Sequence, residues 1–151
     1  MVLALLIGVI AGLRAMMAPA AVSVAARAGW LPLAPTGLAF LGYAFTPWVF
    51  TLLALGELVT DQLPSMPSRT VPIQFGTRLL SGGLSGGAIG AASGMLLPGL
   101  IAGTAGAVAG TLGGRTFRAR LASAFGRDRP AALIEDAVAI LGSFLVMYAL
   151  R

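Results

Sequence analysis

Charged side chains are rare in this sequence, and those inside apolar stretches are the ones able to do chemistry. Ten arginines and five acidic residues carry all the side-chain charge of the 151-residue chain, which has no Lys, His or Cys. A charge at the centre of a bilayer costs about 2.5–3.5 kcal/mol, so it needs a partner or a water-lined cavity. Seven charged residues lie in or beside long apolar segments: Arg14, Glu57, Asp61, Arg69, Arg78, Glu135 and Asp136.

The missing residue types limit the chemistry open to this set. Without Cys and His there is no thiolate, no Ser-His-Asp triad and no His- or Cys-ligated metal, and without Lys there is no Schiff base. Paired carboxylates can do acid–base work, but no nucleophile, metal-ligand set or phosphate-binding loop accompanies them. We therefore expect no enzyme activity, no cofactor and no metal centre. A small cation or a proton is the ligand that the acids favour.

The composition places these residues in a membrane. Hydrophobic residues make up 58% of the chain and charged residues 10%, too few charges to cover the surface of a soluble domain. A membrane-spanning helix needs about 20 mostly apolar residues. We predict an all-α fold, a polytopic membrane bundle of about five transmembrane helices in a single domain, 1–151. The predicted spans cover about residues 2–26, 38–63, 71–97, 99–115 and 131–150.

Two local features complete this topology. No charged residue stands between Leu79 and Gly114, a stretch too long for one crossing, and Pro98-Gly99 near its middle predicts a tight turn. Residues 115–129 form a basic amphipathic segment expected at the membrane interface. Its arginines act as a topology signal rather than as a nucleic-acid site, since the membrane already explains the charge bias.

The arginines also predict the orientation. With five spans, the N-terminus and the loops after the second and fourth spans lie on one side, which carries seven arginines against two on the other. Arginine-rich loops stay in the cytoplasm. We therefore expect a multi-pass protein with a cytoplasmic N-terminus, whose main partner is the lipid bilayer.

Glycine spacing predicts how the helices pack. The third and fourth spans carry glycines on common helix faces: Gly82, Gly86, Gly90 and Gly94, then Gly103, Gly106 and Gly110. Small residues let helix backbones approach closely in a bilayer, so these spans should pack antiparallel, as a glycine zipper. The segment 8–12 is echoed at 99–103, three helices later, which suggests a possible inverted repeat of the kind found in transporters.

Counting residues along the spans places the charges in one layer. Glu57 and Arg78 lie about 9–10 Å from the cytoplasmic ends of their spans, and Glu135 lies about 7–9 Å from its own. Asp61 is one turn from Glu57, while Arg14 is about 18 Å deep with a side chain long enough to reach the others. We expect Glu57 and Arg78 to pair. The acids outnumber the arginines, and protonation, the neighbouring loop or a cation could offset the surplus.

The motifs that hold these residues, taken together, resemble a known family. They are Gly12-Leu13-Arg14-Ala15-Met16, Glu57-x-x-x-Asp61, Pro67-Ser68-Arg69, Arg78-x-x-x-Gly82 and Ile134-Glu135-Asp136-Ala137, and they extend over nearly the whole chain. The sequence resembles an uncharacterised bacterial integral-membrane family, domain of unknown function 4126. The resemblance implies a bacterial inner-membrane protein and no particular activity. Family members often carry Lys after the Asp of the second-span motif, where this chain has Gln62.

Two functions remain open. The first is an ion, proton or small-solute permeation or transport protein, with Glu57 and Asp61 as cation or proton acceptors and Arg14 and Arg78 as counter-charges. The alternative is a non-transporting structural or accessory membrane protein, in which charges and glycine stripes only hold helices or a partner together. A bundle this small encloses little space, so we expect a homo-oligomer, with a dimer favoured.

Overall fold

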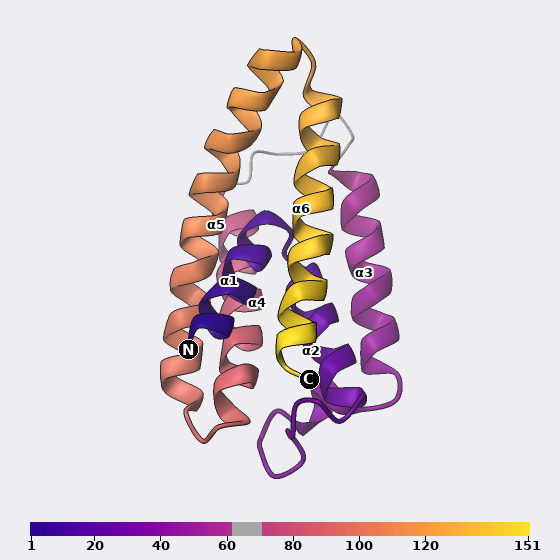
Figure 1. The fold of residues 1–151 in the computed structure, drawn as a ribbon, viewed down its shortest axis with the longest axis vertical. Coiled ribbons are helices and arrows are strands. Elements are labelled where there is room, and N and C mark those ends of the chain that lie inside the picture. The colour runs from indigo at the N-terminus through magenta and orange to yellow at the C-terminus, as the bar shows by residue number, and fades with distance from the viewer. Residues whose placement is uncertain (62–70) are drawn as a thin grey trace.

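The computed structural model describes residues 1–61 and 71–151 (Figure 1). Within these ranges the chain is all-helical, as predicted, and has no strand. Its elements are α1 (Val2–Leu13), α2 (Met17–Arg27), the short 3-10 helix η1 (Ala39–Gly42), α3 (Thr46–Thr60), α4 (Pro72–Ala91), α5 (Leu96–Phe125) and α6 (Asp128–Ala149).

The expected first span, residues 2–26, is not one helix, because the chain breaks at Arg14. This residue is extended, with φ −140° and ψ 109°, and separates α1 from α2. Figure 1 shows α1 rising to the break and α2 descending from it, so the two helices form a hairpin. The prediction of a single N-terminal span is therefore wrong.

The direction of α1 follows from its glycine contacts with α5. Gly8 lies against Gly103, and Gly12 lies against residues 107–111, so the two helices run in the same direction. An inverted relation between the segments 8–12 and 99–103 is thus wrong. Gly103 lies about 34 Å along α5 from the α5–α6 turn at Gly126. The N-terminus therefore begins far from the arginine-rich turn, not beside it as the five-span topology required.

Other predicted boundaries also move. The described part of the predicted span 38–63 divides into η1 and α3, and Pro47 stands in the first turn of α3, where a missing N–H costs nothing. The turn expected at Pro98-Gly99 lies earlier, where Gly94 adopts φ +71°, a conformation that glycine reaches without strain. Residues 115–129 are no separate interfacial segment, because α5 continues to Phe125 and turns at Gly126 into α6.

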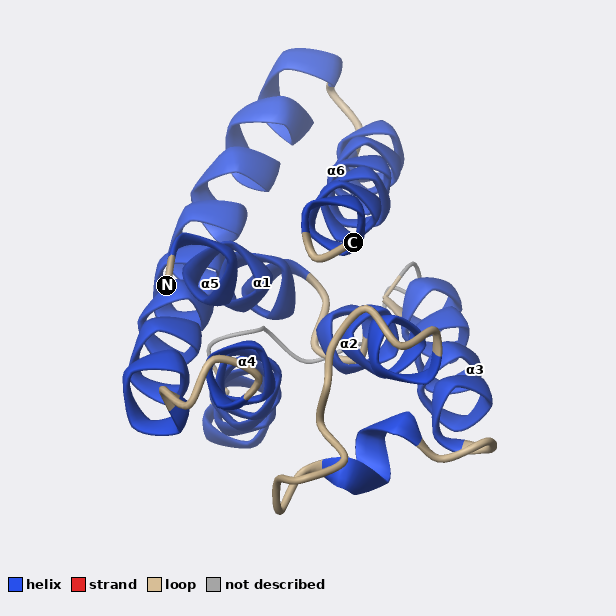
Figure 2. Cartoon of the chain, turned by 60° about the horizontal axis from the view of Figure 1, so that its bottom comes forward, coloured by secondary structure: helices blue, strands red, loops and turns tan. Residues whose placement is uncertain are grey.

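Helices α1, α4 and α5 pack around their glycines. A Cβ added to Gly86 would lie 2.5 Å from the carbonyl oxygen of Gly99 and 2.6 Å from Cα of Gly103, so the backbones of α4 and α5 are in contact. Gly106 and Gly110 face α1 instead, and Gly94 lies in the turn with open space around it. Figure 2 shows α1, α4 and α5 grouped together, with α2 and α3 on the other side of the bundle.

Two of the described helices, α5 and α6, are long and apolar enough to cross a membrane, and α1 and α3 are shorter apolar helices. The described residues do not show five spans, and the hairpin at Arg14 replaces the single N-terminal span on which the five-span topology depended. What the fold does provide is a broken helix, α1–α2, enclosed by α3, α4, α5 and α6.

Candidate functional site

The break between α1 and α2 exposes backbone groups that a continuous helix would pair. The last carbonyls of α1 and the N–H groups before α2 lack partners within their own helices. Inside a helix bundle such groups must be paired by side chains. The charged residues of α3 and α4 supply these partners.

Arg78 of α4 caps the end of α1. Its Nη1 donates hydrogen bonds to the carbonyl oxygens of Gly12, at 2.8 Å, and Leu13, at 2.7 Å. The side chain is 1% exposed. A cation is favourable there because the C-terminal end of a helix carries partial negative charge. Thr111 of α5 adds a hydrogen bond to the Gly12 carbonyl at 3.3 Å.

Glu57 of α3 caps the other side of the break. Its Oε1 accepts a hydrogen bond from the N–H of Ala15, and its Oε2 accepts one from the N–H of Met16, each at 2.8 Å. An anion is favourable at this position because α2 begins here and helix N-termini carry partial positive charge. A single carboxylate thus pairs both N–H groups that precede α2.

Arg14, the residue at the break, joins α3 to α6. Its Nε donates to Oδ1 of Asp136 at 2.7 Å, and its guanidinium also forms ion pairs with Asp61 and Asp136. The side chain is 1% exposed. The extended backbone at Arg14 therefore coincides with a buried arginine held by carboxylates from two different helices.

The two arginines share one network. Arg78 Nη2 lies 3.7 Å from Glu57 Oε1 and 3.9 Å from Asp61 Oδ2, so the pair expected from the sequence, Glu57 with Arg78, is formed. Because Asp61 contacts both Arg14 and Arg78, it links the two arginines. We call Arg14, Glu57, Asp61, Arg78 and Asp136 the break cluster.

One described site residue, Glu135, is not part of the break cluster. Glu135 is fully buried but lies 3.7 Å from Nη1 of Arg118 on α5, and Arg118 also donates from Nε to Asp128 at 2.9 Å. Arg69 lies outside the described residues. Sequence reasoning missed Arg118 because it assigned residues 115–129 to the interface. The nearby acids Asp128 and Glu135, just beyond the Gly126 turn, were the available signal.

In the break cluster, the arginine side chains are less exposed than the carboxylate side chains. The arginine side chains are 1% exposed, whereas those of Glu57, Asp61 and Asp136 are 14%, 12% and 10% exposed. The carboxylates are therefore the more exposed part of the cluster. Three acids against two arginines leave a formal surplus of one negative charge among the described members.

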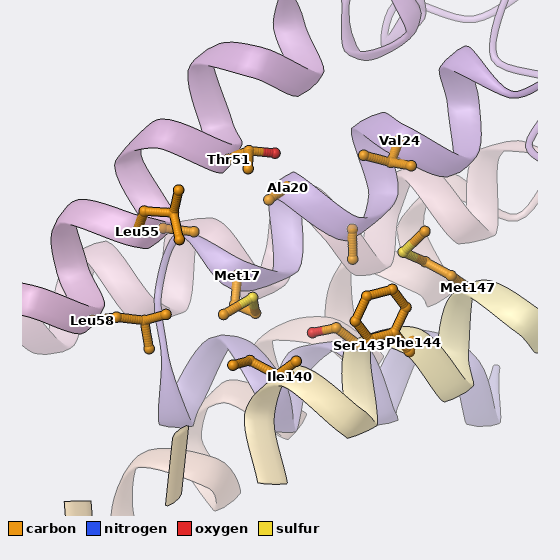
Figure 3. A pocket seen from close by; sticks show the side chains of 12 residues that line it. Met17, Ala20, Val24, Thr51, Leu55, Leu58, Ile140, Ser143, Phe144 and Met147 are labelled. Atoms are coloured by element: carbon orange, nitrogen blue, oxygen red, sulfur yellow. The ribbon is translucent and has the colours of Figure 1, made fainter. Parts of the chain in front are cut away.

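An apolar groove begins one helix turn from the break cluster (Figure 3). It has a volume of about 300 Å³ and runs between α2, α3 and α6. Met17 and Leu58 directly follow Met16 and Glu57 in sequence, and Ile140 lies one turn beyond Asp136, so these three residues mark the end near the cluster. The described lining residues are Met17, Ala20, Ala21, Val24, Thr51, Ala54, Leu55, Leu58, Ile140, Ser143, Phe144 and Met147.

Fold and site together define an all-helical protein whose N-terminal helix is broken and capped by buried charges. The chain belongs to the family described as a domain of unknown function, DUF4126, whose family model matches residues 1–149. A search of curated proteins and a search of solved structures each found no match.

Proposed function

We propose that this chain is a small multi-pass protein of the bacterial inner membrane. The exposed apolar surface of its long helices supports this setting, because only 33% of the apolar window of α5 and 39% of that of α6 is buried. The core helix of a soluble protein would be mostly buried. Large side chains such as Trp48, Leu52 and Leu145 are 67–71% exposed, as lipid contact would require.

We further propose that the end of the bundle at the α5–α6 turn faces the cytoplasm. Arginines gather along this end of α5 and the start of α6, at positions 115, 118, 120, 127 and 129. Arg27 and Arg151 lie toward the opposite end. Positive charge is retained on the cytoplasmic side, which favours this orientation.

The function that the geometry supports best is movement of protons or small cations through the break cluster. The observation that carries the proposal is the broken helix itself. A continuous helix over the same residues would pair its own backbone and need no buried charge. Transporters place broken helices at their binding sites, where helix ends and charged side chains converge.

Within this proposal, Glu57, Asp61 and Asp136 are the acceptors for the proton or cation. They are the more exposed part of the break cluster, and among its described members they carry the surplus negative charge. Arg14 and Arg78 are positioning residues, because they hold the carboxylates and the end of α1 in place. Since each carboxylate already has a protein partner, cation entry would require an ion pair to open.

The test is flux in liposomes that contain the purified protein. We expect proton or monovalent-cation flux above that of empty liposomes, and at least about a tenfold loss in Glu57→Gln, which cannot ionise. Its single amide oxygen keeps a hydrogen bond from one of the two N–H groups, Ala15 or Met16, and its NH2 cannot accept the other, so the melting temperature is measured alongside flux. Asp128→Asn is the matched control, because Asp128 lies at the exposed α5–α6 turn. Its flux should equal that of the wild type.

Two results would reject transport. One is wild-type flux no higher than that of empty liposomes for H⁺, Na⁺ and K⁺. The other is unchanged flux in Glu57→Gln when its melting temperature is also unchanged.

A second function, a non-transporting structural or accessory role, is favoured by one observation: Glu57 and Arg78 are both used to cap helix ends. In that case Glu57→Gln lowers the melting temperature or changes the oligomeric state, and no flux is measured. A homo-oligomer is compatible with both functions. The exposed apolar face of α6 that includes Leu141, Leu145 and Tyr148 is the surface we propose for a second copy.

A further inference from the structure

The groove between α2, α3 and α6 continues into a second hollow at the end of α2. Val24 lines both spaces, and the second is lined by Val24, Arg27, Ala28, Ala44, Phe45, Pro47 and Trp48. The apolar surface therefore starts one turn from the break cluster and ends beside an exposed arginine. No acidic residue is among the described residues that line either space.

From this arrangement we propose that the groove binds an anionic phospholipid, with an acyl chain along α2 and α3 and the phosphate at Arg27. The inference rests on the membrane setting proposed above, but not on transport. Its chemistry is that of the lining: hydrocarbon side chains for most of the length, then a guanidinium, which binds phosphate oxygens well.

The length of the groove matches one leaflet. Met17 and Arg27 are ten residues apart on α2, and Trp48 and Leu58 are ten residues apart on α3, so each helix segment is about 15 Å long. The hydrocarbon core is about 30 Å thick, so one leaflet contributes about 15 Å. An acyl chain anchored at Arg27 would therefore end near the bilayer midplane, close to the break cluster.

The residues at the Arg27 end fit the headgroup level of a membrane. Phe45 and Trp48 are 80% and 71% exposed, and Tyr43 just before them is 63% exposed. Tryptophan and tyrosine are enriched where hydrocarbon meets headgroups. Along the groove itself, the hydroxyl of Ser143 donates a hydrogen bond to the carbonyl oxygen of Ala139 at 2.7 Å. Its proton therefore needs no acceptor from a molecule in the groove.

Lipid binding can be measured on the full chain in detergent by native mass spectrometry. The probes are phosphatidylglycerol and phosphatidylcholine with identical acyl chains. We expect phosphatidylglycerol to bind about tenfold more tightly. Both lipids offer a phosphate to Arg27, but only phosphatidylcholine also brings a choline cation close to the guanidinium, which repels it. Arg27→Gln should remove this preference, while Arg151→Gln, at the same end of the bundle, should retain it.

A second pair of variants tests the acyl-chain part. Thr51→Phe fills the groove and should abolish binding of both lipids, whereas Leu52→Phe, on the neighbouring exposed face of α3, should not. Preference for phosphatidylglycerol that survives Arg27→Gln would overturn the proposal, as would unchanged binding in Thr51→Phe. Dimers that become monomers in Thr51→Phe would instead assign the groove to a second copy. None of these outcomes depends on flux, so failure of the transport proposal is seen separately.

Discussion

The two sides of this bundle are packed by opposite means. On one side, α1, α4 and α5 approach until their backbones touch, because glycines line the contacts. On the other, α2, α3 and α6 leave a groove of about 300 Å³ between them, lined by side chains that range from alanine to phenylalanine. The break at Arg14 lies between the two sides. The chain segment 2–27 therefore differs between its two halves. Its first half, α1, is in backbone contact with α5, and its second half, α2, borders the groove.

The largest effect is expected where the two sides join. Arg78→Met leaves the Gly12 and Leu13 carbonyls without their guanidinium and removes the ion pair of Glu57, while Asp61 keeps its pair with Arg14. Breaking a buried ion pair by removing one partner costs about 3–5 kcal/mol. We expect a large fall in the melting temperature of the detergent-solubilised protein. Arg120→Gln, on an exposed part of α5, should stay within about 0.5 kcal/mol of the wild type. A stable Arg78→Met variant would show that the break does not need its cap.

The next effect tests the glycine-packed side. Gly86→Val places carbon atoms where the backbone of α5 now lies, so the helices must separate. Overpacking of this kind costs about 1–3 kcal/mol. Thermal unfolding measures the loss, and Gly113→Ala is the control. Gly113 has open space around it, so alanine there should stabilise α5 by about 0.5–1 kcal/mol. Equal stability of both variants would mean that α4 and α5 are not in backbone contact.

The smallest effect is expected on the groove side, where added volume should be tolerated. Thr51→Leu extends an apolar side chain into the groove and should change the free energy of unfolding by less than about 1 kcal/mol. The same measurement as for Gly86→Val applies. A loss as large as that of Gly86→Val would contradict the contrast between the two sides, because it would mean that the groove is as tightly packed as the glycine contacts.

Sequence reasoning identified the residues of the site better than the helices that hold them. Arg14, Glu57, Asp61, Arg78 and Asp136 meet as a cluster because charges inside apolar segments have few alternatives to pairing with one another. The pairing of Glu57 with Arg78 followed from their similar depth along two helices.

Hydropathy does not reveal the break, although Pro19, which stands in the first turn of α2, is a residue that disfavours a continuous helix there. Residues 2–26 are apolar and contain a single charge, so hydropathy favours one long helix. What ends α1 is a set of contacts from distant residues: Arg78 to the carbonyls and Glu57 to the N–H groups. Such tertiary capping leaves no local signal. The same limit explains why Glu135, adjacent to Asp136, was assigned to the cluster although its side chain turns to Arg118.

The turn between α4 and α5 shows a different limit. Pro98-Gly99 has the composition of a turn, yet proline is equally suited to the first turn of a helix, and Pro98 takes that position in α5. The turn forms instead at Gly94, which sequence reasoning had counted as part of a packing stripe. Two local interpretations of glycine and proline compete here, and tertiary packing decides between them.

The direction of α1 is the most direct test of the central claim, which is that α1 runs beside α5 in the same direction and ends at Arg14 inside the bundle. Because the chain has no Cys, two engineered cysteines at exposed positions can each carry a spin label in the same molecule. Val2 is compared with Ile101 and with Phe125, and each distance is measured by double electron–electron resonance. The account predicts that the Val2–Ile101 distance is shorter than the Val2–Phe125 distance by about 20 Å or more, since residues 101 and 125 are about 36 Å apart along α5. The opposite order, with Val2 nearer Phe125, would contradict it.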